Sequence, residues 1–135
     1  MPQLRGVFGS ATATALALVL ALSTALVALA NVPVTSISSD PYANTDSQHA
    51  TQVEPDSFAF GSTIVTAVQT GRFYNGGASN ICWSTSTNSG STWTNGCLPG
   101  LTNNTPPGGG TFDRVSDPVV AYDAKHNVWM IPPCR

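Results

Sequence analysis

The sequence predicts an all-β fold, on three observations. Two β-prone runs, Ser79–Ser86 and Thr92–Cys97, flank an Asn-Ser-Gly turn at 88–90, whose residues tolerate positive backbone φ angles or hydrogen-bond locally. This pattern indicates a hairpin. The run Thr63–Gln69 is β-branched and apolar almost throughout, which is typical of a strand buried on both faces. Glycine, serine, threonine, asparagine and proline are plentiful, as expected for short strands joined by turns.

The folded region is expected to begin at Glu54, with a first short strand at Ser57–Phe60. Together with the three runs above, it makes four antiparallel strands within residues 54–97. A long loop rich in Pro and Gly follows at 98–116, and the pattern then restarts. Asp117–Tyr122 echoes the acidic-Pro start and first strand, and Val128–Ile131 echoes the second strand. The echo is either a true repeat or a chance match, and the hairpin between the two copies favours the repeat.

The N-terminus has the layout of an export signal. Arg5 is the only charge before Ala11–Ala30, a run of almost pure Ala, Leu and Val that ends in an Ala-Leu-Ala cleavage site. Residues 1–30 are therefore predicted to be a helical signal peptide that is removed on secretion. The alternative is an uncleaved membrane anchor, because about 20 apolar residues can span a bilayer. Residues 31–53 are polar, which indicates an extended leader that lies on the domain or hangs free, with His49 as a solvated loop residue.

The three cysteines fit an exported protein. Cys82 and Cys97 lie on opposite arms of the predicted hairpin and face each other if it closes around residues 89 and 90. Cross-strand neighbours have Cβ atoms about 4.5–5.5 Å apart, close enough for a disulfide. The alternative is two buried free thiols, but an exported domain can keep the bond. Cys134 is left without a partner.

The hairpin also carries a recognisable motif. Its spaced residues Ser86, Asn88, Gly90, Thr92 and Trp93 resemble the Asp-box, or BNR, repeat of sialidase-like β-propellers. In that family the first polar side chains bind turn amides, the Gly takes the strained position, and the Trp packs in a propeller blade. Asn stands here where the family has Asp, and its carbonyl oxygen can accept the same hydrogen bonds without the help of a charge. The motif is structural and implies a fold, with no catalyst.

The resemblance implies a partial propeller for residues 54–135. Residues 54–97 would form one four-stranded blade, 98–116 a loop, and 117–131 the start of the next blade. That is about one and a half blades, whereas a closed propeller has about four to eight. The chain of 135 residues is therefore interpreted as the N-terminal piece of a longer secreted protein.

Sialidases, as a family, use an arginine triad on the substrate carboxylate, a Tyr nucleophile activated by Glu, and an Asp acid/base. Little of that set can be placed here. Beyond the leader the arginines are Arg72, Arg114 and Arg135, and no Tyr–Glu pair can be matched, so the catalytic residues stay unknown. Arg114 with Asp117 is the pair most like a site; the plainer interpretation is an arginine that binds loop carbonyls and an aspartate that caps a turn. His126 is expected at a hairpin tip.

Composition and spacing exclude several other functions. The net charge of −2 gives no sign of a nucleic-acid-binding surface, and membrane contact is expected only through an uncleaved signal segment. No zinc-ligand spacing or phosphate-binding loop occurs, so no metal or cofactor is expected. Two classes stay open for the parent: a secreted glycosidase of the exo-alpha-sialidase type, of which this chain alone is inactive, or a non-catalytic extracellular Asp-box propeller that binds glycan or protein.

Overall fold

The computed structural model describes residues 34–105 and 109–134, and this part of the chain is all-β. It contains six strands and no helix; the strands are β1 (Gln48–Phe60), β2 (Thr63–Arg72), β3 (Ala78–Ser86), β4 (Thr94–Cys97), β5 (Ala121–Asp123) and β6 (Val128–Met130). Residues from Ser36 onward form one compact unit that holds all of them. Of the preceding unit, 1–35, only Val34 and Thr35 are described, and both are exposed.

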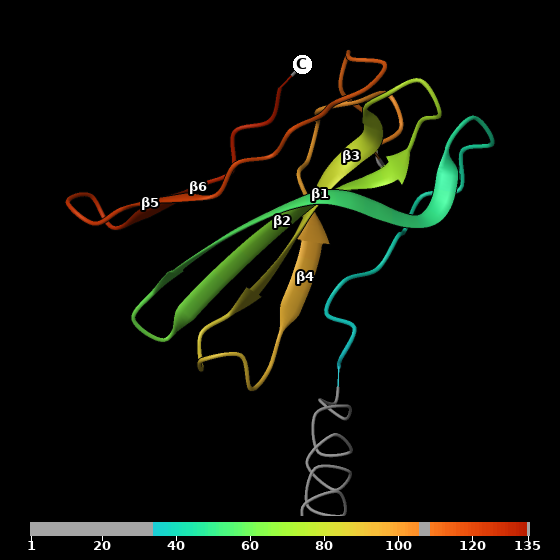
Figure 1. The fold of residues 1–135 in the computed structure, drawn as a ribbon. Coiled ribbons are helices and arrows are strands. Elements are labelled where there is room, and N and C mark those ends of the chain that lie inside the picture. The colour runs from blue at the N-terminus through green and yellow to red at the C-terminus, as the bar shows by residue number, and fades with distance from the viewer. Residues whose placement is uncertain (1–33, 106–108, 135) are drawn as a thin grey trace, which may run out of the picture. The chain divides into compact units, whose positions relative to one another are not determined.

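The strands make two antiparallel sheets (Figure 1). β1 to β4 follow one another in chain order in a four-stranded sheet, and β5 pairs with β6 in a two-stranded one. The register of β3 and β4 sets Cys82 opposite Cys97 and Thr85 opposite Thr94. The predicted all-β class and antiparallel pairing are confirmed.

One face of the large sheet carries the apolar core. Val65, Ala67 and Ile81, from β2 and β3, are buried there together with Val115 and Val120 from the chain that precedes β5. The opposite face of β2 is only half-buried, as Ile64 shows, so the prediction that this strand is buried on both faces was too strong. Alternate side chains of a strand point to opposite faces, and this strand accordingly has two unlike faces.

Aromatic side chains fix the small sheet to β1. The Phe60 and Tyr122 rings are 4.5 Å apart between centroids, and Phe58 meets Trp129 edge-on at 6.1 Å. The Asp56 carboxylate adds a polar tie, because its Oδ2 accepts a hydrogen bond of 2.7 Å from the Val120 amide. The two sheets thus meet along the first strand.

β1 is longer and less regular than the sequence predicts. It starts at Gln48, nine residues before the expected start of the strand at Ser57, and its register with β2 shifts twice. Each shift contains a non-glycine residue in the left-handed region, Ala50 with φ 54° and Glu54 with φ 52°. These are β-bulges, in which extra residues bend the strand and sharpen its twist. Pro55 fits the second one because a bulged position can leave its nitrogen unpaired.

The segment from Ile37 to Asn44 packs against strand β3. The Ser84 hydroxyl donates to the Ile37 carbonyl at 2.7 Å, and the Ser79 hydroxyl donates to Asn44 Oδ1 at 3.0 Å. The sequence leaves two possibilities for the leader, which either lies on the domain or hangs free. Residues 37–44 lie on the domain.

His49 is exposed to solvent, as predicted, but it lies in strand β1 and not in a loop. It lies in the first bulge of β1, where Nε2 is 2.8 Å from the Asn44 carbonyl and Nδ1 is 3.2 Å from Asp40. The hydrogen bond to the Asn44 carbonyl is the main cause that raises the pKa of His49; desolvation lowers it, and the Asp40 carboxylate raises it further. Asp40 also accepts a hydrogen bond from the Ala50 amide and so stabilises the backbone of the bulge.

The predicted signal segment, residues 1–30, lies outside the described residues. In the part of the chain that the structure describes, no helix is long and apolar enough to cross a membrane.

The Asp56–Val120 hydrogen bond yields a first prediction. Replacing Asp56 with Ala removes a charged acceptor that joins the two sheets and should lower the free energy of unfolding by about 1.5–3 kcal/mol. Asp56→Asn keeps an acceptor oxygen and should cost less than half as much. Denaturant melts of the purified chain measure both variants. Equal losses in the free energy of unfolding would show that the hydrogen bond to the Val120 amide does not account for the destabilisation.

Candidate functional site

The turn at residues 88–90, where the sequence resembles an Asp-box, is held by its own side chains. The Ser86 hydroxyl oxygen accepts hydrogen bonds from the Asn88 amide at 3.3 Å and the Gly90 amide at 2.9 Å. Its proton goes to Asn88 Oδ1, 2.9 Å away. Ser86 is almost fully buried, and its one hydroxyl satisfies two backbone amides of the turn.

The remaining motif residues close the turn from the other side. Asn88 Oδ1 accepts from the Thr92 amide at 2.9 Å, and its Nδ2 donates to the Thr92 hydroxyl at 2.8 Å. The Trp93 indole donates to the Gly90 carbonyl at 3.0 Å, and Gly90 has the φ of 87° that favours glycine. All five residues therefore belong to one hydrogen-bonded unit. Trp93 is half-buried, less enclosed than the motif's packing role implies.

The predicted disulfide between Cys82 and Cys97 is confirmed. The Leu98 amide donates to the Ile81 carbonyl at 2.9 Å just beyond the pair. The cysteines therefore occupy a position where the two strands exchange no hydrogen bonds and their side chains approach most closely. Cys134 is exposed and free.

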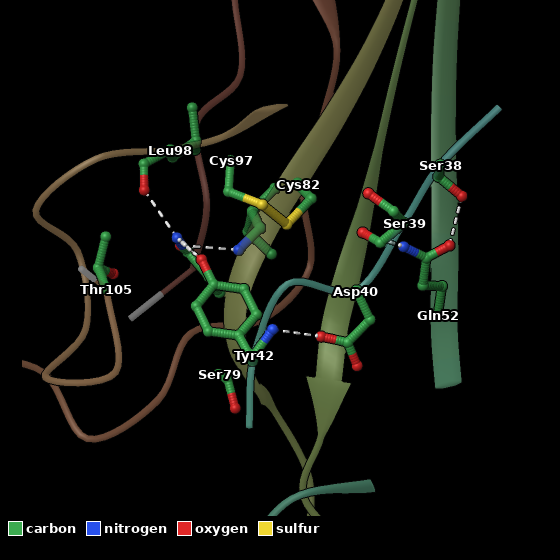
Figure 2. Close-up of a disulfide and its surroundings, with 12 residues drawn as sticks. Ser38, Ser39, Asp40, Tyr42, Gln52, Ser79, Cys82, Cys97, Leu98 and Thr105 are labelled. Carbon is green, nitrogen blue, oxygen red and sulfur yellow. Dashed lines mark hydrogen bonds between the residues drawn. A yellow bond between two sulfur atoms is a disulfide. The ribbon is translucent and has the colours of Figure 1, made fainter. Parts of the chain in front are cut away.

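A cleft of about 380 Å³ opens beside this disulfide. Its walls come from three parts of the chain: the segment before β1, the paired strands β3 and β4, and the loop after β4. The lining residues are Ser38, Ser39, Pro41, Tyr42, Cys82, Trp83, Asn95, Gly96, Cys97, Pro99 and Thr105. Figure 2 shows the Tyr42 ring near the disulfide, with Thr105 on one side and Ser38 and Ser39 on the other.

One buried amide fixes the base of the cleft. Asn80 Nδ2 donates to the Tyr42 hydroxyl and to the Leu98 carbonyl, both at 2.7 Å, while Asn80 Oδ1 accepts from the Ile81 amide (Figure 2). Burial is the main reason that the pKa of Tyr42 is raised. A fully satisfied buried amide is rigid, so the Tyr42 ring is held in one place.

Trp83 forms the wall on the β4 side. A Cβ atom added to Gly96, its cross-strand partner, would lie only 2.7 Å from the indole Cζ2 atom. The ring therefore lies flat on the glycine backbone, and only glycine leaves room for it. The indole is partly exposed and lines both this cleft and a second hollow on the core face beside Val65.

The structure separates Arg114 from Asp117. Arg114 Nη1 donates to Asn75 Oδ1 and to the Gly76 carbonyl, both at 2.8 Å, and its guanidinium lies 5.0 Å from the Phe73 ring centre. Arg114 thus holds a loop, as the plainer interpretation stated. Asp117 instead lies with Glu54.

Glu54 and Asp117 form a carboxyl pair. Both side chains belong to acidic-Pro steps at the start of the two echoing segments, and both residues have positive φ angles. The hydrogen bond to Asp117 is the main cause that raises the pKa of Glu54. The buried Gln69 amide also donates to the Glu54 carboxyl, and Ser116 donates to Asp117. The two positions that the sequence pattern equated therefore meet in space.

His126 lies at the tip of the β5–β6 hairpin, next to Asp123, and contacts the solvent. This agrees with the prediction. Among the described residues, no group of three or more His, Cys, Asp or Glu side chains could hold a metal ion.

Comparisons with family models, with curated proteins and with solved structures find no match to this chain.

The cleft was not predicted from the sequence. Four of its eleven lining residues lie within 38–42, assigned to the leader, and the cleft forms only when these residues meet β3 and β4. One signal was present: Tyr42 is the single aromatic residue in a polar stretch, and such a residue often anchors a segment on a domain.

The disulfide yields a second prediction. It closes a loop with a sequence separation of 15 residues, so replacing Cys82 and Cys97 together with Ser should lower the free energy of unfolding by about 3 kcal/mol. Cys134→Ser is the matched control and should leave the melt unchanged. Mass spectrometry after chymotryptic cleavage at Trp83 or Trp93 should show the linked peptides. Alkylation of both thiols without reductant would disprove the bond.

The carboxyl pair yields a third prediction. Since the folded pKa of Glu54 is raised, its contribution to stability is fully present below the ordinary carboxyl pKa and is lost as the pH rises through the raised value. Glu54→Gln keeps an acceptor for Gln69 and removes the repulsion from Asp117. The variant should therefore melt at a higher temperature than the unmodified chain at pH 7, with the difference vanishing at acidic pH. Asp113→Asn changes the net charge equally and should not reproduce this profile.

Proposed function

We propose that this chain is the opening blade of an exported, sialidase-like Asp-box propeller and serves a structural role in it. The hydrogen bonds of Ser86 and Asn88 around the turn carry the proposal, because they have the partners that the motif requires. The four-stranded antiparallel sheet in chain order is consistent with a single blade. The β5–β6 hairpin would then begin the next one, about one and a half blades in all.

The described residues support a structural role over a hydrolytic one. A carboxylate clamp needs guanidinium groups whose planar fork faces the substrate. The Arg114 guanidinium donates hydrogen bonds to the 75–76 loop, and Arg72 Nη1 donates to the Gln48 side chain. The hydrogen bonds of Glu54 go to Gln69 and Asp117, and no tyrosine hydroxyl in the described part of the chain shares them. A sialidase site in the parent would therefore need residues from beyond this region.

Export is part of the proposal. A disulfide persists in an oxidising compartment, and the apolar run at residues 1–30 has the pattern of a cleaved signal. Cleavage after Ala30 would leave Asn31 as the first residue, and an uncleaved run would tether the chain to the membrane.

The second candidate is a non-catalytic extracellular propeller that binds glycan or protein. The cleft beside the disulfide favours it, because aromatic and amide groups converge there away from the carboxyl pair.

The Asp-box assignment yields a fourth prediction. Asn88→Asp restores the residue that the motif prefers and should make the hydrogen bonds from Ser86 and Thr92 charge-assisted. We expect a gain of about 1 kcal/mol at pH 7. The carboxylate accepts hydrogen bonds in the fold, so the gain should disappear as the pH falls below the ordinary Asp pKa. Asn95→Asp adds the same charge outside the turn and should bring no such gain. Destabilisation by Asn88→Asp at pH 7 would contradict the assignment.

A fifth prediction concerns the function itself. When the gene product is expressed in a secreting host, N-terminal sequencing of the exported protein should begin at Asn31. The purified chain should release no fluorophore from a sialic acid conjugate. Turnover that is lost in Arg114→Ala would assign Arg114 to an active site and overturn the structural role. Retention of the full-length chain in the membrane fraction would overturn the proposed cleavage.

A further inference from the structure

We propose that the cleft beside the Cys82–Cys97 disulfide binds an uncharged sugar. This inference goes beyond the structural role proposed above and does not need the Asp-box assignment, because none of the five motif residues lines the cleft. Its volume of about 380 Å³ is at the small end of ligand pockets and suits one or two sugar rings.

The absence of charge in the lining selects for a neutral ligand. None of the described residues that line the cleft carries an ionisable acid or base in its charged form at pH 7. The nearest acid, Asp40, lines a neighbouring hollow and is occupied by the Tyr42 amide, the Ala50 amide and His49. A carboxylate-bearing sugar would lose hydration on entering without meeting a cation, which is costly. A neutral sugar loses far less.

Two aromatic side chains line the cleft: Trp83, which is partly exposed and can pack on a sugar ring, and Tyr42, which is mostly buried. Trp83 is held flat against Gly96, and Tyr42 is held by Asn80, so both rings are fixed before any ligand arrives. Rigid aromatic rings bury large areas at low entropic cost, and each also has a polar edge. Fixed walls of this kind lower the ordering cost of binding.

Polar groups at the rim complete the chemistry. Within the described residues, the Asn95 amide, the Trp83 indole N–H and the Ser39 hydroxyl make no hydrogen bond to protein. Asn95 offers two donors and one acceptor, and the indole offers one donor. Neighbouring hydroxyls of a sugar are both donors and acceptors and can use these groups together. A purely apolar ligand would leave them unpaired.

The test is direct binding to the full chain. Isothermal titration and saturation-transfer NMR would compare galactose, glucose, N-acetylglucosamine, lactose and cellobiose with N-acetylneuraminic acid. We expect millimolar binding of at least one neutral sugar and weaker binding of the acidic one. Asn95→Ala removes the rim amide and should weaken binding about fivefold to tenfold. Thr94→Ala is the matched control: it is the preceding residue of β4, lies on the opposite face and should change nothing.

Trp83→Phe separates stacking from folding. It keeps a flat ring over Gly96 and removes the indole N–H, so a thermal melt close to that of the unmodified chain combined with weaker binding supports the cleft. No binding of any of the neutral sugars, stronger binding of N-acetylneuraminic acid, or an affinity that Asn95→Ala leaves unchanged would overturn the proposal. These outcomes are independent of the Asn88→Asp result, so failure of the Asp-box assignment and failure of the sugar site can be told apart.

Discussion

The buried amide of Asn80 is the interaction on which the described fold depends most. It is completely removed from solvent, and an amide buried without partners costs several kcal/mol. Three parts of the chain supply those partners: Tyr42 from the segment before β1, Ile81 from β3, and Leu98 from the chain that leaves β4. Satisfying one side chain in the centre of the sheet therefore fixes the path of both the incoming and the outgoing chain. The cleft beside the disulfide exists because these paths converge there.

The two faces of the sheet are held by different physical forces. The face of Val65 and Ile81 is closed by apolar contact with the chain around β5. The stability of this contact depends on the apolar area that is buried and only weakly on the exact geometry. The other face is closed by hydrogen bonds from Asn80 and Ser84, which tolerate little displacement. The polar face is thus the better place for a preformed cleft, and the apolar face the better place for further packing.

What the sequence predicted correctly was local. The β3–β4 hairpin, its turn and the opposed cysteines follow from neighbours within about 20 residues, where turn chemistry and strand alternation are informative. The contact of Tyr42 with Asn80 joins residues 38 positions apart and left no periodic pattern. The bulges of β1 were missed because Ala50 and Glu54 adopt positive φ values that their residue types do not suggest. Arg114 and Asp117 make separate contacts, as the plainer interpretation of Arg114 implies, because closeness in sequence says little about side-chain direction in a loop.

The irregularity of β1 has a consequence for solubility. β1 is an edge strand of the four-stranded sheet, and a straight edge offers a row of unpaired amides and carbonyls to any other strand. Two bulges, with Pro55 in one of them, break that row into short pieces that a foreign strand cannot match in register. The opposite edge, β4, has only four residues. A sheet rich in β-prone sequence is thereby shielded at both edges against growth into aggregates.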